Sequence, residues 1–175
     1  SLRHLFKDEQ RRILNRIISE DVTSVTDTLR KTVRDYSEVL SFLAALSMPV
    51  PDAFRSAAEV VLNDDLLKAL ESLPLDLVFL ERRVADAETW GISLDLSSLL
   101  HTATRRLEEF LARLGDEPEN RAVLGEFHAL LSFLARRKWD VNLWEVQNRL
   151  AKILAGNREL SPEISELYSG AAAML

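Results

Sequence analysis

The residues of this chain that could carry chemistry stand far apart. Its three histidines are His4, His101 and His128, and none has a second histidine or a glutamate at the spacing of helical metal motifs. Helical periodicity predicts that His101 lies on a solvated face and His128 at the edge of the core. The sequence contains no cysteine, which excludes disulfides, thiolate nucleophiles and cysteine-ligated zinc. We therefore expect neither a metal ion nor a cofactor.

Glycine and carboxylate spacings argue against an active site inside the chain. The five glycines stand too far apart for a P-loop, a dinucleotide fingerprint or a nucleophile elbow. Acidic pairs such as Asp64–Asp65 and Glu108–Glu109 are sequence neighbours, and adjacent residues of a helix do not face each other. Glycosidases need two carboxyl groups that face across a cleft. The sequence therefore predicts no catalytic residue.

Residues 136–149 combine aromatic rings with planar amides. Trp139 and Trp144 lie five residues apart, and Gln147 and Asn148 follow Trp144 within one helical turn. Aromatic faces stack on the CH groups of sugar rings, while amides reach the hydroxyl groups. Trp139, Trp144, Gln147 and Asn148 are therefore candidates for a carbohydrate contact or a domain interface. The alternative is that Trp144 packs in the core while Asn148 bonds to a neighbouring loop.

The composition predicts that helices position these side chains. Leucine and alanine supply 50 of the 175 residues, whereas valine and isoleucine supply only 18. Leucine and alanine lose little freedom in a helix, and the β-branched residues that favour strands are scarce. The fold class is therefore all-α, and residues 1–175 are expected to form a single compact bundle of about eight helices.

Apolar periodicity and capping residues place these helices along the chain. In the first part we expect helices from about residue 7, over 23–47, over 51–72 with an irregularity at Asn63–Asp64, and over 74–90 with a stop at Gly91. In the second part we expect helices over 96–114, from 116 or 117 to 134, over 143–156, and from 162 towards 175. Asp95, Asn142 and Ser161 are the expected N-caps of three of these helices, and Gly115 is expected to end one in the left-handed conformation.

The charge distribution excludes some partners. The net charge is −6, and residues 48–100 hold 10 acidic and 4 basic side chains, which accounts for the whole excess. Short basic runs such as Arg105–Arg106 have acidic residues nearby and are expected on solvated helix faces. No basic face is large enough to replace phosphate counterions, so nucleic acid is not an expected partner. No apolar run approaches the roughly 18 residues of a membrane span, and no signal peptide opens the chain. We expect a cytoplasmic protein with no membrane partner.

Three short motifs occur in the order found in a known family. They are residues 5–14 (LFKDEQRRIL), 48–51 (MPVP) and 143–148 (LWEVQN). Together they resemble the helical C-terminal region, of unassigned function, in glycoside hydrolase family 57-like proteins, over nearly the whole chain. The resemblance implies a parent protein of the α-amylase, 4-α-glucanotransferase or branching-enzyme type. Its catalytic carboxylates would lie in a (β/α) barrel upstream, so no catalytic residue is carried over. The start at Ser1 fits the expectation of a fragment.

Three functions follow as hypotheses. The resemblance implies a non-catalytic accessory domain that packs on the catalytic barrel of the same parent chain and helps to shape an α-glucan site. The alternative is a protein-interaction or oligomerisation module with no carbohydrate role, which would expose an apolar patch of several hundred Å² and form a homo-oligomer. A third hypothesis is a small-ligand binder with a pocket near Trp144.

Overall fold

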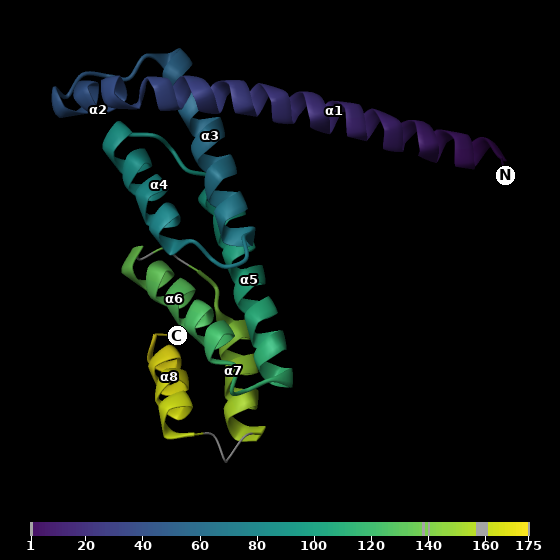
Figure 1. Ribbon diagram of the computed structural model, residues 1–175, viewed down its shortest axis with the longest axis vertical. Helices are drawn as coiled ribbons and strands as arrows, with labels where there is room; N and C mark the ends of the chain where they lie inside the picture. The colour runs from purple at the N-terminus through teal and green to yellow at the C-terminus, as the bar shows by residue number, and fades with distance from the viewer. Residues whose placement is uncertain (1, 138, 140, 157–160, 175) are drawn as a thin grey trace. The chain divides into compact units, whose positions relative to one another are not determined.

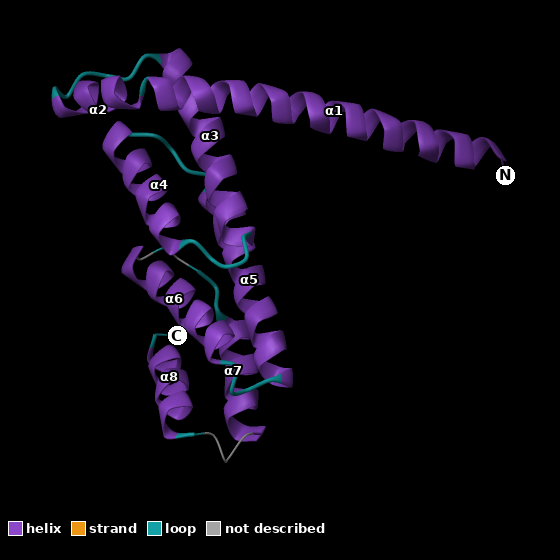
Figure 2. Ribbon diagram, in the orientation of Figure 1, coloured by secondary structure: helices purple, strands orange, loops and turns teal. Residues whose placement is uncertain are grey.

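The structure is a computed structural model that describes residues 2–137, 139, 141–156 and 161–174. These residues form eight α-helices and no strand, which confirms the all-α prediction (Figures 1 and 2). In chain order the helices are α1 (Leu2–Asp35), α2 (Ser37–Ala45), α3 (Asp52–Glu71), α4 (Leu77–Trp90), α5 (Leu96–Asp116), α6 (Arg121–Arg137), α7 (Trp144–Gly156) and α8 (Pro162–Ala173).

The chain packs as two units. Unit 1 comprises residues 1–62 and 87–94, and unit 2 comprises residues 63–86 and 95–175. The boundary falls inside α3 and α4, so each of these helices contributes residues to both units. That residues 1–175 form a single domain stays a prediction.

The core of unit 1 gathers apolar side chains from α1, α2, the first turns of α3 and the last turn of α4. Its buried residues are Val33, Leu40, Val50, Ala57, Ala58, Val61, Leu62, Ala87, Trp90 and Ile92. The indole of Trp90 also donates a hydrogen bond from Nε1 to Ser41 Oγ, at 3.1 Å. Trp90 therefore joins the end of α4 to α2 by both packing and hydrogen bonding.

The core of unit 2 is built around α5. The buried residues of α5 recur at helical spacing and include Leu99, Ala103, Leu107, Phe110 and Leu114. Helix α5 packs against α6 and α7, and α8 packs against the same two helices. The phenol of Tyr168 on α8 is fully buried and donates to the Pro118 carbonyl at 3.0 Å. Its burial raises the pKa of Tyr168, because the ionised form loses its hydration.

The expected helix stop at Gly91 is confirmed. Helix α4 ends at Trp90, and Gly91 adopts φ +65°, a conformation that glycine reaches without a Cβ clash. The Ile92 amide then donates to the Ala87 carbonyl at 2.9 Å, which is the bond of a Schellman motif. The buried side chain of Ile92 adds an apolar contact to this turn.

The predicted break between a helix from residue 7 and a helix over 23–47 is wrong. Helix α1 continues to Asp35, and the break lies at Tyr36, whose φ of −106° and ψ of 7° are not helical. The hydroxyl groups of three threonines in α1 donate to the carbonyl four residues earlier, so they do not interrupt the helix: Thr26, Thr28 and Thr32. At the break, the ring of Tyr36 packs 4.9 Å from that of Phe54.

Two predictions for α3 and α4 are also wrong. Helix α3 runs without interruption through Asn63 and Asp64 because their polar side chains bond away from the helix backbone. Asn63 Oδ1 accepts from the Asp95 amide at 2.8 Å, and Asp64 pairs with Lys68 at 2.7 Å. Helix α4 begins at Leu77 rather than at residue 74, since Asp76 Oδ1 accepts from the Phe79 amide and caps the helix there.

The expected boundary between α5 and α6 is displaced. Gly115 does not end α5, because the Glu117 amide donates an ordinary helical bond to the Arg113 carbonyl at 2.9 Å. The helix stops before Pro118, which has no amide donor and disfavours a helical residue before it. Helix α6 then begins at Arg121 instead of 116 or 117, with Asn120 Oδ1 accepting from the Val123 amide.

The predicted starts of α5, α7 and α8 are confirmed to within one residue. Asp95 caps α5 by accepting from the Ser98 amide and hydroxyl, and these bonds lower the pKa of Asp95 by favouring its ionised form. Asn142 Oδ1 accepts from the Trp144 amide at 3.1 Å at the start of α7. Helix α8 begins at Pro162 as expected, although the Ser161 side chain makes no cap bond.

Candidate functional site

The four residues predicted as carbohydrate or interface contacts divide between two settings. Trp144, Gln147 and Asn148 lie at positions i, i+3 and i+4 of α7 and so share one helix face. Trp139 stands before α7, half-buried, with its ring edge-on to Phe133 at 5.7 Å between centroids. The structure therefore groups three of the four residues and places Trp139 against the core.

The alternative reading, in which Trp144 packs in the core, is wrong. Trp144 is 66% exposed, because Val146, Leu150 and Ile153 form the buried face of α7. Gln147 is exposed as well, and Asn148 is half-buried. The indole and the amide thus present a polar and aromatic surface to solvent.

His101 and His128 occupy the predicted positions. His101 is exposed, which confirms the solvated face, and His128 is half-buried. A Cβ built on Gly170 would lie 3.5 Å from His128 Nε2, so His128 packs closely against α8. In the part of the chain that the structure describes, no three histidine or acidic side chains are placed to hold a metal ion.

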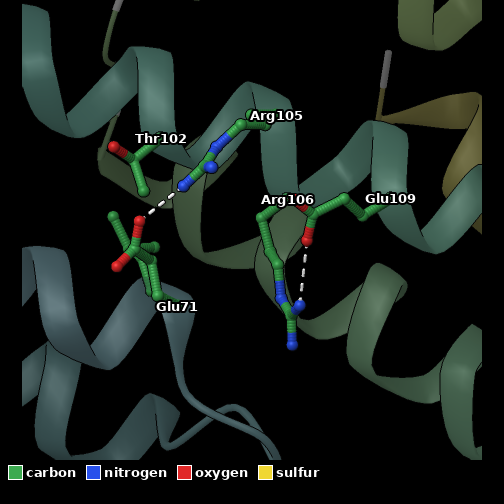
Figure 3. Close-up of a pocket in the computed structure, with 6 residues that line it drawn as sticks. Glu71, Thr102, Arg105, Arg106 and Glu109 are labelled. Carbon is green, nitrogen blue, oxygen red and sulfur yellow. Dashed lines mark hydrogen bonds and ion pairs between the residues drawn. The ribbon is translucent and has the colours of Figure 1, made fainter. Parts of the chain in front are cut away.

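A polar hollow of about 200 Å³ lies in unit 2 between the end of α3 and the middle of α5. Its lining residues are Leu70, Glu71, Thr102, Arg105, Arg106 and Glu109. Figure 3 shows Arg105 joined to Glu71, and Arg106 joined to Glu109. The two guanidinium groups are thus matched by two carboxylates, so the hollow offers no excess charge to an ionic ligand.

The prediction that Arg106 lies on a solvated helix face is wrong. It is only 8% exposed, and its Nη2 donates to the Ser72 carbonyl just beyond α3, at 3.0 Å. Its guanidinium carbon lies 4.6 Å from the centroid of the Phe110 ring, within range of a cation–π interaction. A signal for this burial was present in the sequence, because Arg106 is three residues after Ala103 and four before Phe110 on the apolar stripe of α5.

The acidic excess of residues 48–100 is largely engaged in structure. Asp76 and Asp95 cap helices. Six acidic side chains form ion pairs, and arginines outside the stretch supply the partners of Glu71 and Glu81: Asp52–Arg55, Asp64–Lys68, Asp65–Arg83, Asp86–Arg83, Glu71–Arg105 and Glu81–Arg136. These contacts explain the stretch as part of the fold rather than as a ligand site.

An exposed apolar surface of unit 1 lies on α2 and the turn after it. Val39, Phe42, Leu46 and Met48 are between 48% and 63% exposed, and we call these four residues the α2 patch. Val39, Phe42 and Leu46 follow one face of the helix at spacings of three and four residues, whereas Leu40 on another face is buried. Helix α2 therefore carries one apolar face toward the core and a second one toward solvent.

No family model, curated protein or solved structure matches the chain. Among the described residues, no helix is both long and apolar enough to cross a membrane. The α2 patch, the exposed face of α7 and the polar hollow are features of the described residues from which a function can be argued.

Proposed function

We propose that this chain is a non-catalytic helical domain that docks on a folded partner through the α2 patch. The observation that carries the proposal is the exposure of Val39, Phe42, Leu46 and Met48 beside one another. Large contiguous apolar patches are rare on monomeric proteins and mark interaction sites, because their burial against a partner is favourable.

The partner that we propose is the catalytic barrel of a glycoside hydrolase family 57-like parent chain. The sequence motifs that resemble this family support that choice, and one of them, residues 48–51, includes Met48 of the patch. As an accessory domain, this chain would stabilise the barrel by binding it at the α2 patch.

The docking prediction is tested with the barrel of the parent and this chain as separate polypeptides. Phe42→Ser and Val39→Ser should each weaken binding about tenfold or more in calorimetric titration, since each removes apolar area from the contact. Val78→Ser is the matched control, because Val78 is an exposed valine that lies outside the patch. Equal affinities for all three variants, or a parent gene that encodes no barrel, would contradict the proposal, as would turnover of starch by this chain alone.

A second candidate function is contact with an α-glucan at the exposed face of α7. Its support is the exposure of Trp144 beside Gln147 and Asn148. Titration with maltooligosaccharides should change the tryptophan fluorescence with millimolar affinity. Trp144→Ala should abolish the change, whereas Trp139→Ala should retain it, because Trp139 packs on Phe133. A constant signal up to about 10 mM sugar would contradict this function.

A further inference from the structure

We draw no further inference here: the strongest candidate, the apolar face that Ile18, Val22 and Val25 expose on α1 before the residues that enter the core of unit 1, carries nothing because nothing in the structure shows what covers it.

Discussion

Replacing Trp90 with alanine is expected to lower the free energy of unfolding by about 4 kcal/mol. The side chain is buried in the core of unit 1, where a truncation leaves a cavity. The same change removes the hydrogen bond from Nε1 to Ser41 Oγ. Urea denaturation followed by circular dichroism measures the loss.

Two further variants separate packing from hydrogen bonding at this position. Trp90→Phe retains much of the apolar volume, and Ser41→Ala removes only the acceptor, so we expect losses of about 2 and about 1 kcal/mol. Trp144→Ala is the matched control, because the same indole is removed from an exposed position and should cost less than about 0.5 kcal/mol. If Trp90→Ala were no more destabilising than Trp144→Ala, the core of unit 1 would be wrongly placed.

The features that the sequence predicted correctly depend on residues close together in the chain. The cap at Asp95 needs only Ser98, three residues later, and the stop at Gly91 needs only the freedom of glycine at positive φ. The apolar stripe of α5 likewise follows from helical periodicity alone. Such signals are decided locally, and a single sequence contains them in full.

The predictions that failed depend on partners distant in the sequence. Asn63 was predicted to interrupt a helix, but its side chain accepts a hydrogen bond from the amide of Asp95, 32 residues away. Tyr36 continues the apolar pattern of α1, yet the helix breaks there beside the ring of Phe54. Helix propensity describes a segment in isolation. Tertiary contacts override it where they supply hydrogen-bond partners that the segment itself lacks.

The candidate site was predicted in the same partial way. Helical spacing grouped Trp144 with Gln147 and Asn148, because positions i, i+3 and i+4 always share a face. Which side of α7 is buried depends on α5 and α8, which pack against it, so the exposure of Trp144 was not available from its own segment. The location of the α2 patch could not be predicted. Helix α2 has apolar residues on two faces, and its sequence does not show which of the two faces the core covers.

Arg106→Ala is expected to lower the free energy of unfolding by about 3 kcal/mol, although arginine at a helix surface usually contributes little. The buried guanidinium bonds the Ser72 carbonyl and Glu109 and lies over the ring of Phe110, so its removal loses all three contacts and leaves a cavity.

Arg105→Ala is the matched control for Arg106→Ala. Arg105 is the next residue along α5 and forms a half-exposed ion pair with Glu71, which should contribute less than about 1 kcal/mol. Chemical denaturation of both variants measures the difference, and Arg106→Met tests how much of the loss is packing, because methionine restores volume without charge. Equal losses for Arg105→Ala and Arg106→Ala would mean that Arg106 is solvated, as predicted for the short basic run Arg105–Arg106. A clear excess for Arg106, partly recovered by methionine, would show that its guanidinium fastens the connection after α3 to α5.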